Sequence, residues 1–241
     1  MSLLKFIYKI FGNEWKLNAN AFCEHYRKMG IKIGKNTIVY FGRYPFTQRP
    51  YLDFSRPSLL EIGDNVVLHE GLRIFTHDFV SRLFINKYDE LLPSSGRVVI
   101  GDNVCFGVNC TVLKGVTIGE YSYIGAGSVV NKNIPPYSIA AGVPCRVLCT
   151  LDQYYEKRKM KEIIEAIEYA KSIQERFGRR PISTDFFEEF PLFIDSHNYE
   201  EYPELHTRIK EVLNIHFESW LEKHKAQFDG LEDFLKAAGF N

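Results

Sequence analysis

Residues 100–135 read IGDNVC FGVNCT VLKGVT IGEYSY IGAGSV VNKNIP, which are six hexads that follow one another without a gap. The second position of the hexad is glycine in four of the six, and the fifth is small or β-branched in nearly all. A six-residue repeat of this kind indicates a solenoid made of stacked coils of chain. The first position always holds a large apolar residue, namely Ile100, Phe106, Val112, Ile118, Ile124 and Val130.

This period favours a parallel β-helix, in which each hexad forms one flat side and ends in a bend. An amphipathic helix is excluded, because six residues are neither a whole number of 3.6-residue turns nor a heptad. We expect the apolar first residue to fill the interior and the glycine to supply backbone angles that the corner needs. Each coil is stable only beside its neighbours.

Two earlier runs carry the same pattern, IKIGKNTIV at residues 31–39 and IGDNVVLHEGLRIFTHDF at residues 62–79. Insertions at corners of a solenoid form loops, often on the binding side. The sequence therefore predicts three segments, which are a helical N-terminus (1–30), a β-helix (31–151) that carries two loops (40–60 and 78–97), and an α-helical extension (152–241). A helix is expected from about residue 151 to Gly178, where glycine ends it.

The bulk composition limits the choice of partners and compartment. Formal net charge is zero, with a surplus of positive charge before residue 152 and of negative charge after it, and a basic half attracts anionic ligands. Five cysteines without a CxxC pair indicate reduced thiols in a cytoplasmic protein. No apolar run is long enough to span a bilayer. Residues 1–11, MSLLKFIYKIF, favour an amphipathic helix over a signal peptide, and peripheral membrane contact is the alternative.

The hexads, together with GAGSVVNKNIPPYSIAAGVPCRVL, resemble the hexapeptide-repeat acyltransferases. More narrowly, SLLEIGDNVVLHEGLRIFTHD is similar to bacterial sugar and polysaccharide O-acetyltransferases. The resemblance covers residues 31–151. It implies a left-handed parallel β-helix, acetyl-CoA as the acyl donor, and a homotrimer with each active site between two adjacent β-helices. Nucleic acid is not an expected partner.

In related acetyltransferases the catalytic histidine stands just before the long loop, and His77 in FTHDF occupies that place. A sugar hydroxyl attacks a thioester slowly until its proton is removed, and imidazole can accept a proton near neutral pH. Such general-base help contributes on the order of 10² to 10⁴ in rate. Asp78 is expected to orient the imidazole, to contact the acceptor, or to form a turn.

For the acyl donor, the resemblance points to four residues. Gly107 allows close backbone approach, and Ala126 faces the pantetheine. Lys132 and Arg146 meet the phosphates of coenzyme A as cationic groups. A metal site is not expected, because His69 and His77 do not occupy equivalent hexad positions and no further cluster completes a tetrahedral set.

For the acceptor, loop placement alone points to Arg82, Arg49 and Tyr44. The sequence departs from many relatives at Cys105 and at 69–71, so their acceptor contacts are not carried over. The expected acceptor is a hydroxyl of a sugar or of a cell-surface polysaccharide precursor. An amine on an amino-sugar nucleotide or an antibiotic is the alternative, and a non-catalytic β-helix scaffold is the other.

Overall fold

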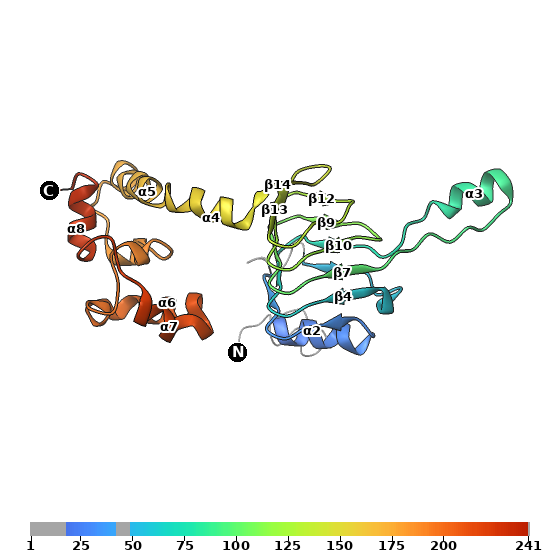
Figure 1. Ribbon diagram of the computed structural model, residues 1–241, viewed down its shortest axis with the longest axis horizontal. Coiled ribbons are helices and arrows are strands. Elements are labelled where there is room, and N and C mark those ends of the chain that lie inside the picture. Colours follow the sequence, from blue (N-terminus) through green and yellow to red (C-terminus); the bar gives the residue numbers. More distant parts are fainter. Residues whose placement is uncertain (1–17, 42–48, 241) are drawn as a thin grey trace. The chain divides into compact units, whose positions relative to one another are not determined.

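The computed structural model describes residues 18–41 and 49–240, so Tyr44 and the predicted helix at residues 1–11 lie outside the described residues. The chain divides into two compact units, residues 1–155 and residues 156–241. Figure 1 labels many of the helices and strands of the two units.

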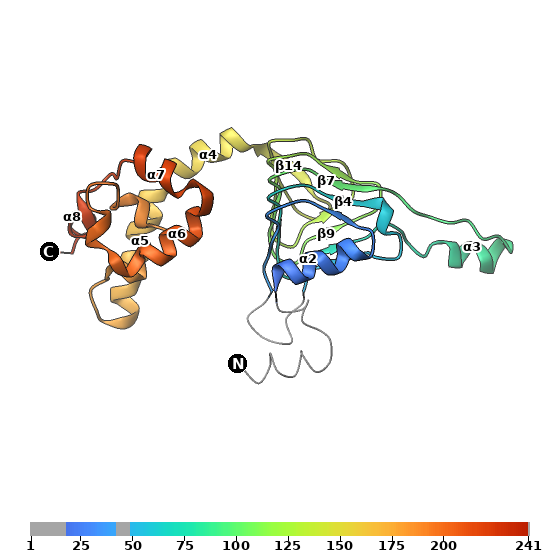
Figure 2. The ribbon, with the colours of Figure 1, turned by 90° about the horizontal axis from the view of Figure 1, so that it is seen from below.

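The first unit is a coil with three parallel sheets along its sides (Figures 1 and 2). The first sheet contains β1 (Lys32–Ile33), β4 (Leu60–Ile62), β7 (Val98–Ile100) and β10 (Thr117–Ile118). The second sheet contains β2 (Ile38–Val39), β5 (Val67–Leu68), β8 (Cys105–Phe106), β11 (Tyr123–Ile124), β13 (Ser138–Ala141) and β14 (Arg146–Thr150). The third sheet contains β3 (Tyr51–Leu52), β6 (Arg73–Ile74), β9 (Thr111–Val112) and β12 (Val129–Val130).

The strand register equals three hexads. Cys105 of β8 pairs with Tyr123 of β11, which holds the same place three hexads later, so one coil takes three hexads and each hexad forms one side. All six residues at the first hexad position are buried, and they belong to one apolar core that runs along the coil. Among the described strands, β14 alone is antiparallel to its neighbour. The predicted fold, a left-handed parallel β-helix with helical ends, is confirmed.

The glycines at the second hexad position have a different role from the predicted one. Neither Gly101 nor Gly107 has a positive φ, so the corner does not need the special backbone angles of glycine there. Instead, a Cβ on Gly107 would lie 2.6 Å from the backbone nitrogen of Ala126 in the next coil. Glycine is needed because adjacent coils approach too closely for a side chain.

We expect Gly107→Ala to destabilise the protein by about 1–3 kcal/mol, because the new methyl group must push two coils apart. The matched control is Gly127→Asn, since Gly127 has a φ of +70° and open space around its Cβ position. Asn109 already adopts a φ of 59° at the same hexad position. Thermal unfolding of both variants checks the prediction, and equal melting temperatures would contradict it.

The left-handed residue of the corner occupies the fourth hexad position. Five consecutive hexads have a positive φ there, at Asn103, Asn109, Gly115, Tyr121 and Gly127. Asparagine and glycine tolerate this conformation better than other residues do. Side chains at this position also link coils, because the Asn36 amide donates to Asn65 Oδ1 at 3.1 Å.

Helix α2 (Ala19–Lys28) covers the N-terminal end of the β-helix. Asn18 caps it, because its side-chain oxygen accepts from the backbone N–H of Asn20 at 2.8 Å. The helix buries Phe22 and Tyr26 against the core of the coil. Arg27 fixes it to the first coil by donating from Nε to the carbonyl of Ile33 at 2.9 Å.

The insertion at residues 78–97 forms an arm that projects from the coil (Figures 1 and 2). It contains α3 (Ser81–Tyr88), which has no buried residue. Its exposed apolar side chains include Phe79, Leu83 and Leu91. In its described part, the insertion at residues 40–60 contains a turn of 3-10 helix, η2 (Pro57–Leu59).

The second unit is helical and has its own apolar core, in which Phe186, Phe193 and Phe234 are fully buried. The predicted helix up to Gly178 is divided into two, and Gly178 ends the second with a φ of 65°. The α-helices after the coil are α4 (Leu151–Lys159), α5 (Glu162–Phe177), α6 (His206–Leu213), α7 (Phe217–Lys223) and α8 (Gly230–Ala237). The 3-10 turns are η3 (Ser183–Asp185), η4 (Phe190–Leu192), η5 (Tyr199–Glu201), η6 (Pro203–Leu205) and η7 (Asn214–His216).

Candidate active site

His77 lies at the corner between the third and first sheets, shortly after the end of β6. The strand register brings Asp53 to it, because Leu52 of β3 pairs with Ile74 of β6 and Asp53 follows directly. Asp53 Oδ2 lies 2.6 Å from His77 Nδ1. The Asp53 side chain is fully buried, whereas that of His77 is 14% exposed.

The Asp53 carboxylate is surrounded by hydrogen-bond donors. Its Oδ1 accepts from the backbone N–H and the hydroxyl of Ser55, at 3.0 and 2.7 Å. Its Oδ2 accepts from the backbone N–H and the hydroxyl of Thr76, at 2.9 and 2.7 Å. Burial raises the pKa of the Asp53 carboxyl, but the hydrogen bonds from Thr76 and Ser55 outweigh burial and hold the pKa well below its ordinary value. Asp53 is therefore ionised at neutral pH.

An ionised carboxylate only accepts hydrogen bonds, so His77 Nδ1 must carry the proton that it shares with Asp53. The Ser55 hydroxyl lies 3.2 Å from the same nitrogen. Nε2 is then left with a free lone pair. The arrangement selects the histidine tautomer that can act as a base through Nε2.

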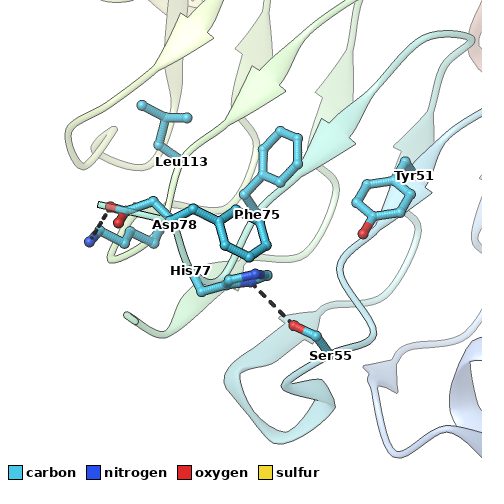
Figure 3. A pocket seen from close by; sticks show the side chains of 8 residues that line it. Tyr51, Ser55, Phe75, His77, Asp78 and Leu113 are labelled. Carbon is cyan, nitrogen blue, oxygen red and sulfur yellow. Dashed lines mark hydrogen bonds and ion pairs between the residues drawn. The ribbon is translucent and has the colours of Figure 1, made fainter. Parts of the chain in front are cut away.

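His77 lines a cavity of about 530 Å³ beside the third sheet (Figure 3). Most of the lining is apolar. The Tyr51 and Phe75 rings lie 5.8 Å apart, and the Phe79 ring lies 5.1 Å from the imidazole in an edge-on arrangement. The lining residues are Tyr51, Ser55, Phe75, His77, Asp78, Phe79, Leu113 and Lys114.

Asp78 is directed toward Lys114, and the carboxylate that contacts the imidazole is Asp53. The Asp78 Oδ2 and Lys114 Nζ atoms are 2.5 Å apart. The hydrogen bond from Lys114 is the main reason that the pKa of Asp78 lies below its ordinary value. Ser94, near the C-terminal end of the arm, donates its hydroxyl to Asp78 Oδ2 at 3.1 Å.

The residues predicted for the acyl donor lie at two different corners of the coil. Lys132 follows β12 in the third sheet, so it shares the corner of His77 and Lys114, which we call the His77 edge. Gly107 and Ala126 follow β8 and β11 in the second sheet, at the corner that we call the Ala126 edge. Ala126 and Lys132 are exposed, whereas Gly107 is buried between coils.

Arg146 lies near the His77 edge. Its Nη1 lies 3.4 Å from Oδ1 of Asn131, the residue before Lys132. The same nitrogen donates to the carbonyl of Cys145 at 2.7 Å. Arg146 is exposed, so its remaining N–H groups are accessible to an anion.

Neither Arg82 nor Arg49, which loop placement predicted for the acceptor, is among the cavity lining. Arg82 lies exposed on α3, on the arm. The guanidinium of Arg49 lies 5.9 Å from the centre of the Phe41 ring. Sequence reasoning missed Asp53, Ser55 and Lys114, which the structure brings to His77.

Residues 18–41 and 49–240 contain neither a metal-binding cluster nor a membrane-spanning helix. Within these ranges no group of three or more histidine, cysteine, aspartate or glutamate side chains is arranged to hold a metal ion. Over the same ranges, no helix is both long enough and apolar enough to cross a bilayer.

Comparison with known proteins agrees with the repeat. Residues 97–132 match the family model of the bacterial transferase hexapeptide, which has six repeats. CapG of Staphylococcus aureus is 34% identical over 148 residues, which are 61% of this chain and 78% of CapG. YvoF of Bacillus subtilis, assigned to the acetyltransferases, is 30% identical over 54% of this chain and 66% of its own.

Among solved structures, an acetyltransferase from Vibrio cholerae in complex with acetyl-CoA is 25% identical, with a TM-score of 0.40, and covers 57% of this chain and 84% of its own. A maltose O-acetyltransferase from Clostridium difficile is 27% identical, with a TM-score of 0.39, over 62% of this chain and 89% of its own.

The repeat and the similarity to CapG define the class of the protein: the chain belongs to the bacterial hexapeptide-repeat transferases. Within that family it is an acetyltransferase.

Proposed function

We propose that this protein transfers an acetyl group from acetyl-CoA to a hydroxyl of a sugar or of a cell-surface polysaccharide precursor, with His77 as the general base. The Asp53–His77 pair carries the proposal. A general base at the edge of a largely apolar cavity needs a fixed tautomer and a free ring nitrogen. The hydrogen bond between Asp53 and His77 Nδ1 fixes the tautomer.

In the proposed reaction, His77 Nε2 takes the hydroxyl proton as the acceptor oxygen bonds to the acetyl carbonyl carbon. The tetrahedral intermediate then breaks its carbon–sulfur bond. The proton passes from the imidazolium to the departing sulfur, which leaves as the free thiol of coenzyme A. Asp53 stays ionised throughout and stabilises the imidazolium. No covalent enzyme intermediate is required.

The residues of the His77 edge support acetyl-CoA as the acyl donor. Leu113 and Phe75 give the cavity an apolar wall that suits a pantetheine chain. Lys132, one coil beyond Lys114, and Arg146 offer positive charge for the phosphates farther along the same edge. All five cysteines are free, which fits a reducing cytoplasm, where we propose that the protein acts.

Thiol release from acetyl-CoA, measured with a panel of acceptors, tests the proposed activity. The panel contains neutral sugars, nucleotide sugars and matched amino sugars. We expect turnover of acceptors that carry hydroxyl groups and no amine. Turnover restricted to amines would favour the N-acetyltransferase alternative. Neither turnover nor binding of coenzyme A would favour the non-catalytic scaffold.

We also propose a homotrimer in which the donor lies between the His77 edge of one copy and the Ala126 edge of the next. The support is that one chain carries the predicted donor residues on two separate corners. A groove between two copies would bring the two edges together.

Mixed oligomers test this arrangement. We expect His77→Ala and Ala126→Arg each to be inactive alone, the second because its exposed position lets the new side chain block the donor. Co-expression in equal amounts should restore about a quarter of the wild-type activity, since a quarter of the shared sites combine an intact His77 with an intact Ala126. An inactive mixture would mean that both residues must come from the same chain.

A further inference from the structure

The base of the arm is tied together next to His77. The backbone N–H of Asp78 donates to the carbonyl of Ser94 at 3.2 Å, and that of Gly96 donates to Thr76 at 2.9 Å. These bonds join the first and last residues of the arm. They close the arm into a hairpin-like base beside the cavity.

Lys114 ties this base to the next coil of the β-helix. It follows β9, which pairs with β6, so it lies one coil beyond Thr76 on the His77 edge. Its Nζ contacts both Asp78 Oδ2, at 2.5 Å, and the Ser94 hydroxyl. One ammonium group therefore contacts both the entry and the exit of the arm.

Beyond its base, the arm packs little against the coil. Helix α3 buries none of its residues, and Phe79 is 80% exposed although it lines the cavity. Phe79, which forms one wall beside the imidazole, thus directly follows Asp78, the residue that pairs with Lys114. A rotation about Asp78 would move the Phe79 ring away from His77.

We infer that the Asp78–Lys114 ion pair sets the position of the arm over the cavity, and that Lys114 is a positioning residue for acceptor binding. This inference rests on the proposed function, in which His77 deprotonates the acceptor hydroxyl, so that the reacting end of the acceptor lies beside His77 where the cavity meets the base of the arm. The ion pair is half exposed, with side-chain exposures of 31% for Lys114 and 45% for Asp78. Such pairs contribute little to stability, so losing it should free the arm without unfolding the coil.

Lys114→Met tests the inference, because it keeps most of the length of the side chain and removes its charge. We expect tryptic cleavage at Arg82 and Lys87 on the arm to become about fivefold faster or more, since a freed segment is cut more readily. The KM for the acceptor should rise about tenfold, while the KM for acetyl-CoA stays within about twofold. The melting temperature should hardly change.

Two further variants separate positioning from general damage. The double variant Asp78→Lys, Lys114→Asp reverses the pair and should restore slow cleavage and the acceptor KM to within about threefold of wild type. Arg97→Gln is the matched control. It breaks the ion pair of 2.6 Å between Glu61 and Arg97, the last residue of the arm. Neither residue lines the cavity, so the substitution should change neither the cleavage rate nor the acceptor KM.

Cleavage of Lys114→Met at the wild-type rate would show that Lys114 does not hold the arm. Faster cleavage with an unchanged acceptor KM would show that the arm does not position the acceptor. Either result overturns the inference. If the wild type turned over no acceptor, the proposed function would fall, and the cleavage rates would still decide whether Lys114 holds the arm.

Discussion

Replacing His77 with alanine is expected to lower kcat by about 10²- to 10⁴-fold, the usual contribution of a general base. The acceptor hydroxyl would then have to lose its proton to water while it attacks the thioester. The Kd of coenzyme A should stay within about twofold, because the imidazole is assigned to proton transfer and the donor phosphates to other residues. Thiol release and isothermal titration measure the two quantities.

The control for His77→Ala is His197→Ala. His197 has a side chain that is 80% exposed and pairs with Asp195 at 3.4 Å in the helical unit. His197→Ala should leave both kcat and the Kd of coenzyme A unchanged. A parallel loss of turnover and of coenzyme A binding in His77→Ala, with a lower melting temperature, would mean that His77 has a structural role.

The hexads alone predicted the side length of the coil and its interior residues. A six-residue period that is apolar at position one is compatible with few other folds. The positions that the pattern misjudged depend on distances between coils. A Cβ on Gly107 meets Ala126 only once the three-hexad register is known, and the left-handed angle of Tyr121 has no signal in its residue type.

The candidate site was predicted where the register is continuous and missed where an insertion breaks it. His77 was found from its place before the long loop. Asp53 was not found, because the spacing between the paired residues Tyr51 and Arg73 is not a whole number of hexads. Counting three hexads back from His77 therefore reaches no carboxylate. Lys114 had a usable signal. Once the arm, residues 78–97, is set aside as an insertion, Lys114 follows Thr76 by three hexads, which is one coil.

Asp53→Asn is the second substitution with a large expected effect. Asparagine keeps the size of the side chain, so the β-helix should fold. Its amide nitrogen cannot accept the Nδ1 proton of His77, and where it faces the ring it favours the tautomer whose Nε2 carries the proton. That tautomer is no base toward the acceptor, so we expect kcat to fall about 10²- to 10⁴-fold while coenzyme A binding is kept.

Stability against pH gives a second, independent readout of the Asp53 carboxylate. A carboxyl whose folded-state pKa is lowered stabilises the fold above its unfolded pKa, and the effect is lost as pH falls through the folded value. The melting temperatures of wild type and Asp53→Asn should therefore differ most above about pH 4 and converge in strong acid. Asp64→Asn is the control, since Asp64 also accepts a backbone N–H, from Lys35 at 2.7 Å, but is not hydrogen-bonded to His77 as Asp53 is. Full turnover in Asp53→Asn would mean that His77 reaches its active tautomer without the carboxylate, and the proposed dyad would be wrong.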